Sequence, residues 1–393
     1  MKKLVLASVL IFAACIPEIY PQSPSDTSVY LVTCGQGKEI YSIYGHSALR
    51  VVIPEKNFDM AYNWGVFDFE TPNFAYKFAK GRLEYMLYPE PFGRFLMTYN
   101  YEKRWVQIQK INLSPSETRV LIGMINENLK PENLKYRYDF LYDNCSTRIR
   151  DLLEKSIGKN LIYSPPESKK KSSFRFLVGT YQDDYPWLDF GIDMLLGTPC
   201  DKRATDRDKM FLPLELQSAF TQAYLTRGNK TIPMLRNAET ILDYGTPVVK
   251  NIFIFEPFFV FTLVCIAVII FSAVKRSGKA VRITDVVIFS IYSIMAVMLL
   301  FTNFLSLHSQ LKANLSMIWL SPFVILCLVA LVLRKKWMTW FRIVFYLCIA
   351  AFLIQIIVPS FGNNAFMPLI MILLVRSSVY AGFSWNPLTI NPI

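Results

Sequence analysis

The sequence predicts an α+β domain followed by an all-α bundle of about five transmembrane helices. Two observations support this division. The chain of 393 residues is 53% hydrophobic, whereas soluble domains are roughly 45–50% apolar. Apart from a short run at residues 4–14, its apolar segments lie after residue 251, and residues 20–250 mix short strands, helix caps and charged turns like a globular domain.

The distribution of charge argues against nucleic-acid binding. The net charge is +12, but residues 16–251 are nearly balanced between acidic and basic side chains, and the excess lies at the N-terminus and around the apolar segments. A nucleic-acid-binding domain needs a basic patch on its own surface. We therefore expect no nucleic-acid partner.

The N-terminus predicts a secretion signal over residues 1–22. Lys2 and Lys3 precede the apolar run at 4–14, which is too short to span a bilayer as a mature helix. Residues 12–15 also resemble a bacterial lipobox ending at Cys15, although Phe12 is a poor match for its first position. Lipidation of Cys15 and ordinary cleavage a few residues later both remain open.

Three short strands open the exported domain. Residues 29–33, 48–53 and 60–67 are rich in β-branched and aromatic side chains, and they are separated by glycines, Pro54 and Asn57. Runs of this composition between turn residues are typical of an antiparallel meander.

A first helix begins at a capping box. Ser114 and Glu117 have the spacing of that motif, and Pro115 occupies the first helical position. The helix should end before Pro131, because proline disfavours the helical conformation of the residue before it.

A second helix is predicted over residues 145–157, where apolar side chains recur at helical spacing. Asp143 or Asn144 can cap its start, and Gly158 can stop it. We expect residues 161–250 to form an extension and linker with a solvated run at 165–171. That segment should also hold a helix over 212–225 and a strand or turn over 237–245 leading into the membrane.

Five apolar segments predict membrane-spanning helices, because each is near the ~20 residues that a helix needs to cross ~30 Å of hydrocarbon. They are residues 252–274, 284–305, 316–333, 341–358 and 366–382. The last is the weakest because Arg376 interrupts it. Basic residues fill the first and third loops between spans, so the positive-inside rule places those loops in the cytoplasm and the N-terminal domain outside.

Cys145 and His46 are the strongest candidates for chemistry. His46 is the sole histidine of the exported domain, and Cys145 falls in the first turn of the predicted second helix. Free N–H groups and the helix dipole stabilise a thiolate there, and an imidazole supplies a general base. Asn63 is our candidate for the group that orients the ring, with Asp68 in reserve. The alternative is that both residues are ordinary packed side chains.

The exported region carries three cysteines, Cys34, Cys145 and Cys200. This is an odd number in a compartment that favours oxidation. If Cys145 stays reduced as a nucleophile, Cys34 and Cys200 are a candidate disulfide that would close a long loop.

Several motifs in matching order resemble the Bacteroides-type lipoprotein N-acyltransferase family. They lie at residues 30–35 (YLVTCG), 41–51 (YSIYGHSALRV), 62–65 (YNWG) and 143–147 (DNCST). That family couples a periplasmic domain to a multi-span membrane domain, and the resemblance covers nearly the whole chain after the signal. The order of a strand histidine before a helix-opening cysteine is also similar to permuted papain-like folds, such as the NlpC/P60-like and lecithin:retinol acyltransferase groups.

The resemblance implies a permuted papain-like catalytic domain over residues 23–160, located in the periplasm, and a transmembrane domain over 251–393 in the bacterial inner membrane. It implies transfer of an acyl chain from a glycerophospholipid, through a thioester on Cys145, to the α-amine of a diacylated lipoprotein. The partners would be these two lipids and the bilayer. No cofactor or metal is expected.

Several further residues are candidates for support or binding. Asn144, Asp143 and Tyr44 are candidates for the oxyanion site and its support, and Arg50, His308 and Asn314 for substrate binding. His308 is otherwise a loop residue or a docking contact for the exported domain. Aromatic residues at 85–101 form either an exposed apolar surface near the acyl chains or part of the hydrophobic core.

Two other classes of function stay open. One is a membrane-anchored cysteine peptidase or amidase of the cell envelope, although five spans are more than a simple anchor requires. The other is a non-catalytic envelope assembly module.

Overall fold

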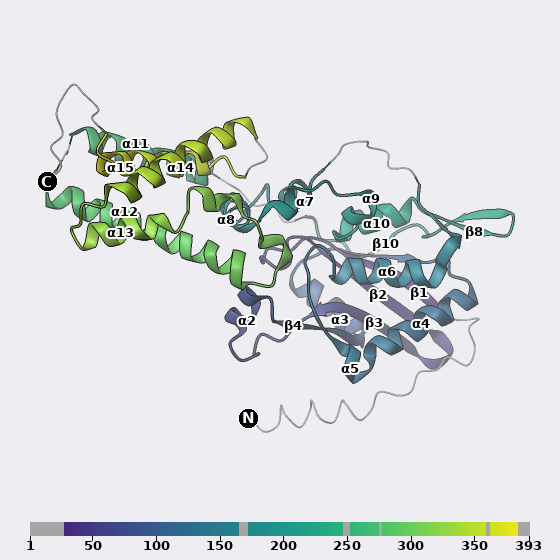
Figure 1. The fold of residues 1–393 in the computed structure, drawn as a ribbon. Helices are drawn as coiled ribbons and strands as arrows, with labels where there is room; N and C mark the ends of the chain where they lie inside the picture. The colour runs from purple at the N-terminus through teal and green to yellow at the C-terminus, as the bar shows by residue number, and fades with distance from the viewer. Residues whose placement is uncertain (1–26, 165–171, 247–251, 275–276, 359–361, 384–393) are drawn as a thin grey trace.

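The computed structural model describes residues 27–164, 172–246, 252–274, 277–358 and 362–383. A sheet region lies beside a bundle of helices (Figure 1), which confirms the predicted order of a mixed domain followed by a helical one. The predicted signal peptide with Cys15, the run at 165–171 and the basic Lys275 and Arg276 of the first loop lie outside the described residues.

A seven-stranded antiparallel sheet forms the centre of the N-terminal region, in the order β10-β5-β1-β2-β3-β4-β6. Its strands are β1 (Ser28–Cys34), β2 (His46–Ile53), β3 (Phe58–Val66), β4 (Glu84–Pro91), β5 (Val106–Lys110), β6 (Lys135–Arg137) and β10 (Glu239–Leu242). The three predicted strands are confirmed as β1, β2 and β3. Buried side chains occupy consecutive positions at 31–34 in β1 and at 47–49 in β2, which fits a sheet that is covered on both faces.

Helices cover both faces of this sheet. They are α3 (Phe92–Tyr101) on one face, and α4 (Pro115–Leu129) and α6 (Cys145–Ile157) on the other. The short helices α2 (Phe74–Lys80) and α5 (Pro131–Leu134) bury no residue. Leu31 and Leu49, which are paired across β1 and β2, belong to the apolar cluster that includes α4 and α6. Val32 and Ala48 are the next pair, and they belong to the cluster that includes α3. The sheet is therefore a middle layer, and the start of α6 lies against it.

The predicted starts of α4 and α6 are confirmed. The Ser114 side chain accepts a hydrogen bond from the Glu117 N–H, and the Glu117 carboxylate accepts one from the Ser114 N–H, at 3.3 and 2.8 Å. Helix α4 ends at Leu129, before Pro131. Helix α6 begins at Cys145, with Asn144 as its cap.

Residues after 160 return to the sheet region. A three-stranded sheet joins β7 (Leu161–Ile162), β8 (Tyr224–Arg227) and β9 (Lys230–Pro233). The helices of this segment are α7 (Phe174–Gly179), α8 (Pro186–Leu195), α9 (Asp206–Lys209) and α10 (Pro213–Thr221). Of these, α8 packs against the helical bundle, since Met194 belongs to the apolar cluster of the bundle. Helix α10 is shorter than predicted, because the chain already pairs as β8 from Tyr224. The segment predicted as a strand or turn over 237–245 contains β10, which pairs with β5.

The C-terminal region is helical, with α11 (Pro257–Val274), α12 (Lys279–Leu300), α13 (Phe323–Val332), α14 (Met338–Ile357) and α15 (Phe366–Tyr380). Three helices of the described residues are long and apolar enough to cross a membrane, or four if the pair bent by 53° around residues 309–332 is one span. Helix α15 has 15 residues, about 22 Å at 1.5 Å per residue, which is short of ~30 Å. The count of five spans therefore stays a prediction.

The arginine that interrupts the last apolar segment is buried in an ion pair. Arg376 of α15 donates from Nε and Nη2 to the two carboxylate oxygens of Asp285 on α12, at 2.6 and 2.7 Å. Its Nη1 donates to Ser272 of α11 at 2.6 Å, and the Tyr380 hydroxyl also bonds to Asp285. Both charged side chains are 1% exposed or less. Three helices are thus joined by one satisfied polar network.

Replacing Asp285 with Asn should lower the melting temperature of the detergent-solubilised protein, because Arg376 then keeps a buried charge without a counter-ion. Removal of one partner from a buried ion pair costs about 3–5 kcal/mol. The double variant Asp285→Leu/Arg376→Leu, which removes both charges, should recover most of this loss. Calorimetry on the three proteins makes the comparison, and an unchanged melting temperature for Asp285→Asn contradicts this role of the pair.

Candidate active site

Cys145 lies at the first position of α6, where the sequence places a strong cap. The Asn144 side-chain oxygen accepts hydrogen bonds from the N–H groups of Ser146 and Thr147, at 2.8 and 2.9 Å. The N–H of Cys145, as the first helical residue, has no carbonyl partner within the helix. Cys145 is 8% exposed, so its thiol sits just below the surface at the positive end of the helix dipole.

His46 begins β2 and faces this thiol. The turn before it ends at Gly45, where φ is +77° and an added Cβ would lie 2.8 Å from the Cys34 carbonyl, so glycine is required there. Burial raises the pKa of Cys145, but the charge of His46 and a hydrogen bond from it lower that pKa, together with hydrogen bonds from the Ser47 backbone and the Ser146 side chain. The net pKa is below the ordinary value. The surroundings of Cys145 therefore favour its thiolate form.

Asn63 of β3 contacts the imidazole, as the role predicted for it requires. Its Oδ1 and His46 Nε2 lie 2.5 Å apart. An amide oxygen can only accept, so Nε2 carries the proton and Nδ1 is left for Cys145. The three side chains predicted as the catalytic group are thus brought together by the structure, whereas Asp68 accepts from the Glu70 N–H in an exposed turn.

Glu90 of β4 stands behind Asn63 and fixes its orientation. Ala61 pairs with Glu90 and Asn63 with Tyr88, so Glu90 is a diagonal neighbour of Asn63 on the same face. Burial raises the pKa of Glu90, whereas Arg94 and a hydrogen bond from Asn63 lower it. A carboxylate accepts only, so Asn63 must turn its amide N–H groups to Glu90 and its oxygen to His46. Glu90 carries no sequence signal, because its role depends on the pairing of β3 with β4.

Ser47, Ser146 and Gly65 complete the surroundings of the thiol. The hydroxyls of Ser47 and Ser146 lie 3.1 Å apart in the interior, and Ser146 Oγ is 3.9 Å from Cys145 Sγ. Gly65 has φ of +90°, and an added Cβ would meet the Tyr138 ring at 3.5 Å and Cys145 Cβ at 3.9 Å. The sequence could have pointed to Ser47 and Ser146 only through their position. Each of them is the next residue after a candidate catalytic side chain, His46 or Cys145.

The structure gives Asn144, Asp143 and Tyr44 the supporting part of the role predicted for them, and the Asn144 amide has no donor left for an oxyanion. Both N–H groups of the Asn144 amide are used, since they donate to the backbone oxygens of Phe140 and Phe211 at 2.7 and 2.9 Å. Asp143 accepts two hydrogen bonds from Arg148. The Tyr44 hydroxyl accepts from Gln182 at 2.6 Å. These residues hold the loop before α6 in place instead.

Cys34 and Cys200 are free thiols, so the candidate disulfide is not formed. Cys34 ends β1 in the apolar cluster under α3, whereas Cys200 belongs to a different cluster and lies 3.5 Å from the Gln310 carbonyl oxygen. Burial raises the pKa of each thiol to about 12, so neither is poised to react at neutral pH.

The three predicted substrate-binding residues lie outside the site. Arg50 forms a two-point ion pair with Asp59, with both hydrogen bonds at 2.7 Å. His308 donates to the Phe78 carbonyl at 2.8 Å, and Asn314 donates to the carbonyls of Met194 and Leu195 at 2.9 and 3.0 Å. His308 and Asn314 therefore dock the sheet region onto the loop between α12 and α13.

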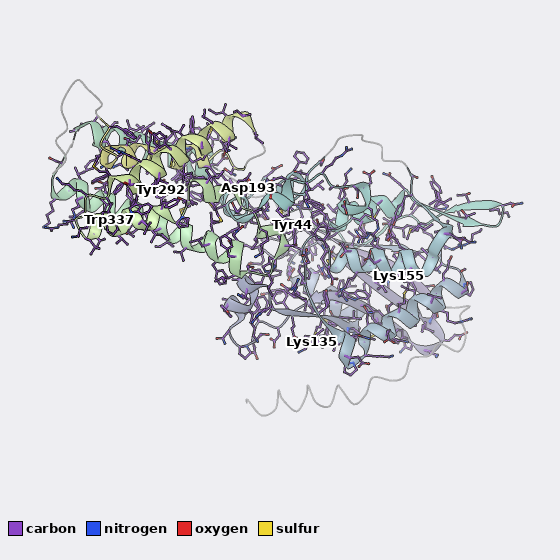
Figure 2. The ribbon with its side chains drawn as sticks, in the orientation of Figure 1. Tyr44, Lys135, Lys155, Asp193, Tyr292 and Trp337 are labelled. Carbon is purple, nitrogen blue, oxygen red and sulfur yellow. The ribbon has the colours of Figure 1, made fainter. Side chains whose placement is uncertain are left out.

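The active-site end of the sheet region points toward the membrane helices. Figure 2 shows Tyr44 at this end, with Asp193 between it and the helical bundle. The Gly197 N–H donates to the Gln310 carbonyl at 2.8 Å, and Asn363 donates to Asp189 at 2.6 Å. The thiol is thus carried on the side of the domain that contacts the membrane region.

Nothing in the described ranges suggests a metal centre, since they contain no group of three His, Cys, Asp or Glu side chains placed to hold an ion. A hollow over β5 and α10 is lined by amide and hydroxyl side chains such as Gln107, Gln217 and Thr221, and none of its lining residues belongs to the Cys145 site. The chemistry that the arrangement supports is nucleophilic attack by a thiolate with an imidazole as acid and base.

Comparisons with known families match both halves of the chain. A model described as the Lnb N-terminal periplasmic domain matches residues 21–169, and one described as the Lnb transmembrane domain matches residues 249–384. Comparison with curated proteins and with solved structures found no match. The two models together cover most of the chain and agree in order with the sheet region and the helical bundle.

Cys145 should be the cysteine of the periplasmic domain that a soluble alkylating agent modifies fastest at neutral pH, because the thiolate is the reactive form. Replacing His46 with Ala removes two interactions that offset burial, so the pKa of Cys145 should rise. The alkylation rate at neutral pH should then fall about tenfold for each unit of that rise. Mass spectrometry of peptides after timed iodoacetamide treatment over a range of pH gives the rates.

Cys200→Ala is the matched control, since its thiol is buried and lies outside the site. It should leave the pH profile of Cys145 unchanged. A His46→Ala protein that reacts at the wild-type rate with the same midpoint would show that the imidazole does not activate the thiol.

Proposed function

Because the chain belongs to the Lnb-type lipoprotein N-acyltransferase family, we propose that it moves an acyl chain from a glycerophospholipid to the α-amine of a diacylglyceryl-cysteine lipoprotein. Its N-terminal domain is periplasmic and its C-terminal domain lies in a membrane, which we take to be the bacterial inner membrane. The observation that carries the proposal is the grouping of Cys145, His46 and Asn63 at the start of α6.

In the first step the Cys145 thiolate attacks the ester carbonyl of the phospholipid. The carbonyl oxygen becomes an oxyanion, and we assign its stabilisation to the Cys145 N–H at the start of α6, because Asn144 already bonds the N–H groups of Ser146 and Thr147. As the intermediate collapses, the carbon–oxygen bond to the glycerol breaks and the His46 imidazolium gives its proton to the leaving alkoxide. The products are a lysophospholipid and a thioester on Cys145.

In the second step the lipoprotein amine attacks this thioester. His46, now neutral, takes the proton that the amine loses, and the carbon–sulfur bond breaks to return the thiolate. The new bond is an amide, so the acyl group ends on nitrogen. Asn63 holds the imidazole through both steps, because the same ring must first donate and then accept a proton.

The membrane region supports this function by keeping the site near both substrates. Each substrate is anchored in the bilayer by its acyl chains, and a tethered site searches for them in two dimensions at a raised effective concentration. The hydrogen bonds of Gly197, Asn314 and Asn363 across the two regions hold the periplasmic domain against the bundle.

Cys145→Ala should abolish N-acylation of a diacylated lipoprotein by the full-length protein in phospholipid vesicles, and His46→Ala should reduce it by about 10²–10⁴-fold. Mass spectrometry of the lipoprotein N-terminal peptide measures the third acyl chain, and release of lysophospholipid measures the first step. Cys200→Ala should retain activity.

Two outcomes would overturn the proposal. Unchanged N-acylation with Cys145→Ala would show that the thiol is not the nucleophile. If acylation is absent in the wild type but Cys145 is needed for cleavage of peptidoglycan stem peptides, the protein is a cell-envelope amidase.

A further inference from the structure

The periplasmic domain exposes a cluster of aromatic side chains around α2. Phe69, Tyr76 and Phe78 are 62%, 55% and 51% exposed, and no residue of α2 is buried. Phe74 connects them, with its ring 5.2 Å from Phe69 and 6.2 Å from Phe78. A contiguous exposed apolar surface on a periplasmic domain marks a contact with a partner or a membrane.

A continuous line of rings leads from this cluster to the thiol. Phe74 lies 5.8 Å from Phe67, Phe67 lies 5.1 Å from Tyr85, and Tyr85 stacks on Tyr138 at 4.4 Å. Tyr138 in turn lies beside Gly65. A Cβ added at Gly65 would contact both the Tyr138 ring and Cys145, so the two side chains flank the same backbone position. We call the six rings at positions 67, 69, 74, 78, 85 and 138 the aromatic path.

The outer end of the aromatic path lies level with the end of a membrane span. The loop after α12 donates two hydrogen bonds to backbone oxygens of α2. Ser306 Oγ donates to the Ala79 carbonyl at 2.8 Å, and the Leu307 N–H donates to the Lys80 carbonyl at 2.9 Å. Figure 1 shows α2 beside the end of the bundle that faces the sheet region. Aromatic side chains at this depth are typical of the membrane–water interface.

Two cations converge at the same place. Burial lowers the pKa of Lys312, and the neighbouring charge of Lys80 lowers it further. Lys312 Nζ donates to the backbone oxygens of Asn303 and Ser306. The next residue, Leu307, donates its N–H to the Lys80 carbonyl at 2.9 Å, so both lysines belong to the same contact between α2 and this loop. A pair of like charges held at the interface is relieved by a bound anion, and the phosphate of a lipid headgroup is the anion that a bilayer offers there.

We propose that a glycerophospholipid of the outer leaflet reaches the site along the aromatic path, with its phosphate between Lys80 and Lys312 and its acyl ester beside Cys145. The inference rests on the proposed function for the chemistry at the thiol, but binding does not require that chemistry. A lipid is the occupant because one end of the path lies at the bilayer surface and the other at the thiol.

Photo-crosslinking tests this proposal on the full-length Cys145→Ala protein in phosphatidylethanolamine nanodiscs, where no turnover occurs. A small fraction of the lipid carries a diazirine on its acyl chain, and peptide mass spectrometry locates the adducts. Adducts should appear on Tyr138 and residues 67–78, and those on α11 serve as the internal standard. Phe69→Ser/Phe78→Ser should reduce the Tyr138 adduct several-fold, whereas Phe69→Leu/Phe78→Leu should preserve it.

Tyr101→Ser is the matched control, because Tyr101 is an 87% exposed aromatic of the same domain outside the path. It should leave the adducts unchanged. A diacylglycerol with the same photoreactive chain lacks the phosphate and should label Tyr138 about fivefold less than the phospholipid. Lys80→Gln should remove that difference.

Adducts confined to the spans, or a Tyr138 adduct that survives Phe69→Ser/Phe78→Ser, would overturn the path. This failure is distinct from failure of the proposed function. Transfer activity without Tyr138 adducts removes only the path, and Tyr138 adducts without transfer by the wild type remove only the chemistry.

Discussion

The pairing of the Cys145 thiol with the His46 imidazole is the interaction on which the structure of the site depends. Burial opposes ionisation of the thiol, and the same burial raises the pKa of Cys34 and Cys200 to about 12. Cys145 differs because His46, the Ser47 backbone and Ser146 all favour its charged form. The low dielectric that makes an isolated thiolate costly also strengthens these contacts, so the thiolate is favoured only while these partners stay in place.

The fold keeps those partners in place from three directions. Strands β2 and β3 carry His46 and Asn63, and β4 carries Glu90, which fixes the amide of Asn63 and thereby the proton on the imidazole. Helix α6 brings the thiol to the end of these strands, with Asn144 committed entirely to the helix start and the preceding loop. The loop after α12 then docks this end of the domain against the membrane region.

Features with a local signal could be predicted from the sequence, and features that depend on tertiary pairing could not. The strand pattern at β1 to β3 and the caps at Ser114 and Asn144 are encoded within a few residues, and the structure has them as predicted. The trio of Cys145, His46 and Asn63 was recoverable because the exported domain has a single histidine. Glu90 was not, since its role follows from the register of β4. The disulfide prediction was wrong because counting thiols says nothing about their separation. The aromatic residues at 85–101 are partly core, since Tyr85, Phe92, Phe95 and Tyr99 are buried.

The most direct measurement of the central claim is the fate of a labelled acyl chain when no acceptor lipoprotein is present. Incubation of the full-length protein with a phospholipid carrying an isotope-labelled chain should leave that chain on the peptide that contains Cys145, and neutral hydroxylamine should remove it, as expected of a thioester. The adduct should be missing from His46→Ala on the same timescale. A label that is absent from the wild type, or that resists hydroxylamine, would contradict a covalent mechanism through this thiol.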